Sequence, residues 1–114
     1  MARLRREIWI KAQLKICDKL FISAVITKKG DPESGSIIIR LNKNYETCSI
    51  YKPINNINSQ QEWMHVGGSK IVENRVAYDY IQKEIRRDQD IWVLEIDDFG
   101  FKFEEILLQG KHPK

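Results

Sequence analysis

The chain has 114 residues, of which 42% are hydrophobic and 31% charged, and its formal net charge is +3. These totals are those of one globular domain. They exclude a disordered chain and a membrane-embedded one, because no apolar run is long enough to span a bilayer. We therefore expect a single domain over residues 1–114, with frayed ends at about 1–5 and 110–114.

Residues 6–20 fit two structural templates. Apolar residues alternate from Ile8 to Ile16 as they would in a strand, and they also recur every four residues as they would in a helix. The charged side chains cluster on one arc of a helical wheel, and the segment contains no turn residue. The sequence therefore favours a helix here.

Two β-branched runs, at 21–29 and 36–41, flank a glycine-bounded loop with the sequence GDPESG. Pro32 presets a turn dihedral, and the Asp31 side chain can bond the turn backbone. The pattern predicts a hairpin with a longer loop.

The next stretch alternates strands with polar turns. Residues 46–52 are expected to form a third strand, with Cys48 and Ile50 on one face and Tyr51 on the other. Residues 53–60 are polar and turn-rich, which predicts an exposed loop. Residues 61–66 are expected to form a fourth strand.

The segment from residue 72 to residue 98 combines two clear periodic patterns. Apolar residues recur at helical spacing over 72–87, and Ser69 stands where an N-cap is expected. From 91 to 96 the pattern becomes that of a strand buried on both faces, with Trp92, Leu94 and Ile96 on one side and Ile91, Val93 and Glu95 on the other. A short returning strand is expected at 101–103.

Together these elements predict an α+β fold. We expect an antiparallel β-meander packed on one face by the N-terminal helix and by a second helix, which leads into a further buried strand. Trp92 is expected in the core, whereas Trp63 fits either the core or an interface.

The cysteine content and the N-terminal residues predict a cytoplasmic protein. Cys17 and Cys48 are too few for a disulfide framework and are expected to be reduced and buried. The N-terminal stretch alternates apolar and charged residues, so it lacks the apolar core of a secretory signal.

Charge is distributed unevenly along the chain. Residues 1–57 hold eleven Lys and Arg against five Asp and Glu, whereas residues 58–114 hold eight against eleven. This asymmetry fits a basic face for an anionic partner, or two halves that attract each other within the fold or across a dimer. The second interpretation is favoured, because a pI of 8.9 falls short of strongly basic nucleic-acid-binding domains.

Three blocks of the sequence resemble a known family. They are IWIKAQLKICDKLFISAVITKKGDPESGSIIIRLN, EWMH and AYDYIQKEIRRDQDIWVLEIDD, and together they cover most of the chain. The chain resembles the small bacterial proteins grouped as domain of unknown function 1491. Gln89 departs from that pattern, in which a proline stands between the two acidic residues. The resemblance implies a small cytoplasmic α+β protein and no established activity.

Residues 88–98 contain five carboxylates, which raises the hypothesis of a metal-dependent hydrolase. Glu95 and Asp97 project from the same strand face and could share a Mg²⁺ ion or act as acid and base. Ordinary turn chemistry is the favoured interpretation, because no phosphate-binding loop or nucleophile accompanies them. GDPESG has no Walker lysine and no following helix, so it is predicted to be a turn.

The cysteines and histidines raise two further hypotheses, a zinc site and a Cys–His nucleophilic pair. Cys17, Cys48, His65 and His112 lie at none of the short spacings that zinc modules use. A Cys48–His65 pair would require the third and fourth strands to bring the two side chains together.

A second alternative is a weak nucleic-acid binder that grips the phosphate backbone. Lysines and arginines beside aromatic residues on a sheet can hold phosphates while the rings stack on bases. The candidate residues are Arg3, Arg5, Arg6, Lys28, Lys29, Arg40, Tyr45 and Tyr51. No RNP-like or KH-like motif accompanies them.

The sequence assembles no catalytic set and calls for no cofactor. The leading hypothesis is a non-catalytic protein-interaction module that binds an unknown protein partner or associates with itself as a homodimer. Nucleic-acid binding and metal-dependent hydrolysis are the alternatives, and no membrane partner is expected.

Overall fold

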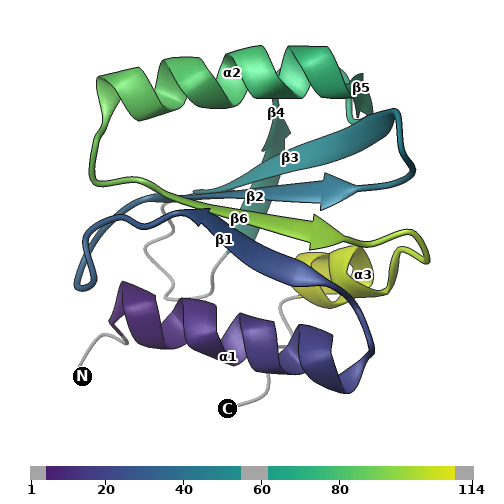
Figure 1. Cartoon of the computed structure of the whole chain (residues 1–114), viewed down its shortest axis with the longest axis horizontal. Helices are drawn as coiled ribbons and strands as arrows, with labels where there is room; N and C mark the ends of the chain where they lie inside the picture. Colours follow the sequence, from purple (N-terminus) through teal and green to yellow (C-terminus); the bar gives the residue numbers. More distant parts are fainter. Residues whose placement is uncertain (1–4, 55–61, 110–114) are drawn as a thin grey trace.

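The computed structural model describes residues 5–54 and 62–109, which form one sheet with helices on both of its faces (Figure 1). The elements are α1 (Arg6–Lys19), β1 (Ala24–Lys28), β2 (Ile37–Asn42), β3 (Thr47–Ile54), β4 (Glu62–Val66), β5 (Val72–Glu73), α2 (Asn74–Arg87), β6 (Trp92–Asp97) and α3 (Lys102–Gln109). The fold is α+β, as predicted. Most of the loop expected at 53–60, and nearly all of the ends expected to fray, lie outside the described residues.

The main strands lie in the order β1-β6-β2-β3-β4, and the short β5 pairs with β3. β2 and β6 run parallel, whereas every other pair is antiparallel. The predicted meander therefore exists only across β2, β3 and β4.

The predicted hairpin between the first two strands is wrong, because β6 lies between β1 and β2. The three consecutive residues Ile37, Ile38 and Ile39 are fully buried. Successive side chains of a strand point to opposite faces, so a run of this kind needs cover above and below. Such a strand lies inside a sheet, with a neighbour on each side, and β6 is the second neighbour of β2.

The glycine-bounded loop closes over the first residues of β6. The Asp31 N–H donates to Asp90 O at 3.0 Å, and Trp92 Nε1 donates to Asp31 O at 2.8 Å. A Cβ atom at Gly30 or Gly35 would collide with Asp90 O, so this approach requires glycine at both positions. The predicted turn is present, but it connects strands that do not pair with each other.

The helices cover opposite faces of the sheet rather than one face. α1 and α3 pack on the layer that contains Trp92, Leu94 and Ile96, whereas α2 packs on the layer that contains Ile91 and Val93. The alternation predicted for β6 is thus confirmed. A strand with apolar residues on both sides needs cover on each face of the sheet. This requirement explains why the helices do not pack on one face as predicted.

The segment at 6–20 forms a helix, as favoured. Ile10, Gln13 and Cys17 are its buried residues, at the spacing of one helical face. Its first turn has no side-chain cap. Instead, the N–H groups of Arg6 and Glu7 donate to the carbonyls of the glycine-bounded loop, at 3.2 and 2.9 Å.

Two expected boundaries were wrong. α2 begins at Asn74 and not after Ser69, because Val72 is buried and pairs with Cys48 as part of β5. A returning strand was expected at 101–103, but α3 begins at Lys102 and Phe101 lies in the turn before it. Trp92 is in the core, as expected, and Trp63 is also buried, with its ring stacked on Trp9 at a centroid distance of 5.5 Å.

Candidate interaction surface

One end of the sheet gathers loops that are far apart in the sequence. β2 and β6 end here and β1 begins here, on the right-hand side of Figure 1. The Asp97 N–H donates to Ser23 O at 2.9 Å, and the Asp98 N–H donates to Asn42 O at 3.0 Å. These bonds hold the α1–β1 turn, the β2–β3 turn and the β6–α3 turn side by side.

Exposed aromatic rings occupy these three turns. Phe21 is 97% exposed, Tyr45 89%, Phe99 45% and Phe101 51%. The rings of Tyr45 and Phe99 meet edge to face, with centroids 5.6 Å apart. Phe103 is the one phenylalanine of the chain that is buried. We call Phe21, Tyr45, Phe99 and Phe101 the aromatic end.

Two of these phenylalanines adopt a left-handed backbone. Phe21 has a φ of 57° and Phe101 a φ of 61°, and they are the only non-glycine residues with positive φ in the part of the chain that the structure describes. This conformation is costly for a bulky side chain. Each is held by a turn hydrogen bond, from Phe21 N–H to Asp18 O and from Phe101 N–H to Asp98 O. The strained residues therefore lie in turns that leave both rings exposed to solvent.

A buried polar network supports the aromatic end from below. Lys43 Nζ lies 2.8 Å from Glu104 Oε1, and the Tyr51 hydroxyl donates to Glu104 Oε2 at 2.8 Å. The ring of Phe101 covers this network, with Lys43 Nζ 4.5 Å from the ring centroid. The β2–β3 turn, strand β3 and helix α3 are therefore tied together beneath the exposed rings.

The environment of the network fixes its protonation. Burial disfavours the charged form of Glu104, but the hydrogen bonds from Lys43 and Tyr51 outweigh it and hold the pKa of Glu104 below its ordinary value. Burial, with the Glu104 carboxylate beside it, raises the pKa of Tyr51. The carboxylate is therefore charged and the phenol neutral at pH 7.

Asp98 acts as a helix cap. Its two carboxylate oxygens accept hydrogen bonds from Phe103 N–H at 2.9 Å and from Glu104 N–H at 2.8 Å. Because these first amides of α3 have an acceptor, the helix can begin directly after the turn that carries Phe99 and Phe101. This carboxylate, predicted to belong to an acidic turn, thus serves the geometry of the aromatic end.

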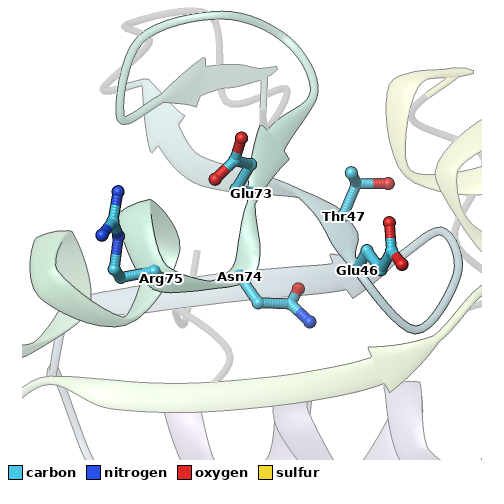
Figure 2. A pocket seen from close by; sticks show the side chains of 5 residues that line it. All are labelled: Glu46, Thr47, Glu73, Asn74 and Arg75. Atoms are coloured by element: carbon cyan, nitrogen blue, oxygen red, sulfur yellow. The ribbon is translucent and has the colours of Figure 1, made fainter.

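A pocket of about 510 Å³ opens beside the β2–β3 turn. Figure 2 shows its lining side chains, which are Glu46, Thr47, Glu73, Asn74 and Arg75. The Asn74 side chain donates to Tyr45 O at 2.8 Å, and its backbone N–H donates to Glu46 O at 2.9 Å. Because the lining mixes both charges with neutral polar groups, the pocket favours no one class of ligand.

The residues proposed for nucleic-acid binding do not form one surface. Arg5, Arg6, Lys28 and Lys29 lie where β2 and β6 begin, at the opposite end from Tyr45. Several of their charges have protein partners there: Arg6 Nε donates to Gly35 O, Lys28 Nζ donates to carbonyls ahead of β6, and Arg5 pairs with Glu33 at 3.5 Å. Arg3 lies outside the described residues.

The remaining members of that set are also separated from one another. Arg40 lies on the α2 side of the sheet, where its Nε donates to Asn42 Oδ1 at 3.0 Å. Tyr51 would need an exposed ring to stack on a base, but it is 2% exposed and packs in the core against the α1 side. Side chains along β3 alternate between the two layers of the core. Ile50 falls in the α2 layer and Tyr51 in the α1 layer, so the Tyr51 ring points into the core.

The two carboxylates of the metal hypothesis project from the same face of β6, and each has a protein partner. Glu95 Oε1 lies 3.7 Å from Arg40 Nε, and Asp97 Oδ1 accepts a hydrogen bond from Asn42 Nδ2 at 2.8 Å. Within residues 5–54 and 62–109, no group of three His, Cys, Asp or Glu side chains could hold a metal ion. The arrangement gives no support to the hydrolase alternative.

The cysteines are unpaired and buried in different layers: Cys17 is on the buried face of α1, and Cys48 is on the face of β3 that α2 covers. Cys48 and His65 cannot form a nucleophilic pair, because His65 pairs with Tyr51 and shares its face, opposite to that of Cys48. Burial raises the pKa of Cys17 to about 12 and raises that of Cys48, which disfavours a thiolate at either position. His112 lies outside the described residues.

Sequence reasoning missed most of this surface. The sequence pattern predicts a strand at Phe101 and links neither Phe21, Phe99 nor Lys43 to it. A detectable signal is the pair of phenylalanines around Gly100, directly after a strand that is apolar on both faces.

No helix in the described ranges is both long and apolar enough to cross a membrane.

The chain matches one protein family and is similar in fold to solved structures. Residues 4–102 match the family described as "Protein of unknown function (DUF1491)". The crystal structure of a DUF1491 family protein from Caulobacter crescentus CB15 aligns with a TM-score of 0.72 and 24% identity, over 84% of this chain and 87% of that chain. The NMR structure of a DUF1491 family protein from the same organism gives 0.72 and 22%, over 98% and 93%.

A solution structure of a protein from A. tumefaciens aligns with a TM-score of 0.71 and 22% identity, over 84% of this chain and 86% of that chain. At these identities the likeness concerns the fold alone. No curated protein matches the chain.

Proposed function

The chain belongs to the DUF1491 family of proteins of unknown function, and we propose that this member is a non-catalytic protein-interaction module that binds its partner through the aromatic end. The observation that carries the proposal is the exposure of four aromatic rings on three turns at one end of the sheet. Aromatic residues are enriched in the centres of protein interfaces, where they contribute most of the binding energy.

The area of these rings supports the proposal. Their exposed fractions, multiplied by the roughly 200 Å² of an aromatic side chain, give about 550 Å² of accessible surface. The largest apolar patch on a typical monomer covers about 300–600 Å² and is often functional. The summed area of the four rings is of that size, and the contact between Tyr45 and Phe99 joins two of them.

The rigidity of the supporting layer is a second argument. The Lys43–Glu104–Tyr51 network and the Asp98 cap fix the turns that carry Phe99 and Phe101. A surface that is already ordered loses little conformational entropy on binding.

We also propose that the module is cytoplasmic, since both cysteines are unpaired, as is usual in a reducing compartment.

Site-specific photo-crosslinking in cells tests this function. A photoreactive phenylalanine analogue at position 45 should form covalent adducts with protein, because Tyr45 is almost fully exposed within the aromatic end. The control is position 8, where Ile8 is 46% exposed near the start of α1, at the opposite end of the sheet from the aromatic end.

Adducts at position 45 that protease removes, and that are several-fold stronger than at position 8, support the module. Equal labelling at the two positions contradicts it. Adducts that nuclease removes and protease does not would also contradict it, and would favour the nucleic-acid alternative.

A further inference from the structure

The charged residues around the aromatic end are balanced in sign. Exposed cations and exposed anions occur in equal numbers on its turns, on the ends of α1 and α3 beside them and around β5: Asp18, Lys19, Glu46, Lys70, Glu73, Arg75, Asp97 and Lys102. Binding to nucleic acid or to an anionic membrane requires an excess of cations at the contact. A strongly acidic or basic protein partner requires an excess of the opposite charge. Neither excess is present here.

A surface that is apolar at its centre and balanced at its rim is complementary to itself. In a two-fold contact the same patch is used on both copies, so each cation of one rim can face an anion of the other. Aromatic rings also pack well against rings, in offset or edge-to-face geometry, as Tyr45 and Phe99 already do within one chain.

The available area suits such a contact. A stable protein interface buries about 800 Å² on each partner. The four rings supply about 550 Å² of this, and the charged residues around them supply the polar rim that interfaces carry.

We propose that the occupant of the aromatic end is a second copy of this chain, docked aromatic end to aromatic end about a two-fold axis. The proposal rests on the function proposed above, since it identifies the partner of the same surface. Phe21 lies at the centre of its test, because it is the most exposed ring and adopts a strained backbone.

Sedimentation equilibrium of the purified chain, from micromolar to submillimolar concentration, measures this association. The average mass should rise from the 13.5 kDa of one chain to twice that value. Phe21→Asn should raise the dimer dissociation constant on the order of 100-fold, because each of the two copies loses one buried aromatic ring. Ile8→Asn, at the opposite end of the sheet, is the control and should leave the dissociation constant unchanged.

Misfolding cannot account for the expected loss. Asn tolerates the left-handed backbone better than Phe, so Phe21→Asn should melt no lower than the wild-type chain at concentrations where both are monomeric. A variant that dissociates more readily while its monomer stays equally stable supports the proposal.

Two results would overturn the dimer. One is a single-chain mass at every concentration, and the other is a dimer that Phe21→Asn leaves unaffected. If the chain is monomeric and position 45 still forms adducts with other proteins, the interaction function stands and only the second copy is excluded. If the chain is monomeric and position 45 forms no adducts beyond those at position 8, both proposals fail.

Discussion

Replacing Glu104 with glutamine should destabilise the fold strongly, because it removes the counter-charge of a buried lysine. The side chains of Lys43 and Glu104 are 4% and 11% exposed, and their charged atoms are 2.8 Å apart. Glutamine keeps the shape of glutamate and an oxygen that can accept from Tyr51, but it leaves the Lys43 ammonium without a negative partner. Removing one member of a buried pair typically costs about 3–5 kcal/mol.

We expect Glu104→Gln to lower the free energy of unfolding by about 3 kcal/mol, at the lower end of that range, because the Tyr51 hydrogen bond is retained. For a chain of this length, the melting temperature should fall by roughly 12 °C. Urea titration followed by tryptophan fluorescence measures the change, with the slope against urea checked to stay constant.

Two variants control this measurement. Lys43→Met combined with Glu104→Gln removes both charges and should recover about 2 kcal/mol relative to Glu104→Gln alone. Arg5→Ala breaks an exposed pair with Glu33 and should cost no more than about 0.5 kcal/mol. A loss below about 1 kcal/mol for Glu104→Gln, or a double variant less stable than the single, would refute the view that this network supports the aromatic end.

Three further outcomes follow from the same contacts. The pKa values of Glu104 and Glu84 are lowered in the fold, so their stabilisation is complete above their ordinary pKa of 4.5 and is lost as the pH falls further. Urea titrations should therefore show a steeper acid loss for the wild type than for Glu104→Gln, and parallel profiles would contradict this. Asp98→Ala removes the acceptor of two α3 amides and should cost about 1–2 kcal/mol by urea titration, whereas Asp97→Ala should cost less; equal losses would contradict the capping role. Burial and raised pKa values should keep Cys17 and Cys48 unreactive toward a chromogenic disulfide until urea unfolds the chain, and rapid labelling of the native protein would show that this packing is wrong.

Local patterns predicted the elements that depend on local contacts. The spacing of charged residues identified α1, and the alternation from Ile91 to Ile96 correctly assigned each side chain of β6 to its layer. Period-two alternation fixes which face a residue occupies, whatever the neighbouring strand is.

Strand order could not be obtained in this way, because pairing between distant strands leaves little trace in either sequence. The turn residues around Pro32 favoured a hairpin, yet β6 enters between the two strands from the far end of the chain. The run of three isoleucines at 37–39 was the available clue, since a strand buried on both faces belongs inside a sheet. Its second neighbour could not be identified from that clue alone.

The aromatic end was hidden for a related reason. Its four rings come from three turns that become neighbours only when β1, β2 and β6 pair. The buried Lys43–Glu104 pair likewise joins a turn and a helix that are distant in the sequence. Exposure of an aromatic residue is a property of the assembled surface, so composition alone cannot distinguish Phe21 in solvent from Phe103 in the core.

Fluorine NMR of the chain labelled with fluorinated phenylalanine tests the central claim most directly. The chain has four phenylalanines, of which three belong to the aromatic end and Phe103 is buried as an internal reference. A soluble paramagnetic agent should broaden the three exposed resonances in dilute purified protein, and should broaden them much less in an extract of cells that express the protein, because a bound protein covers the rings. If the three resonances remain as accessible in the extract as in dilute buffer, while Phe103 is unchanged in both, the aromatic end is not a binding surface.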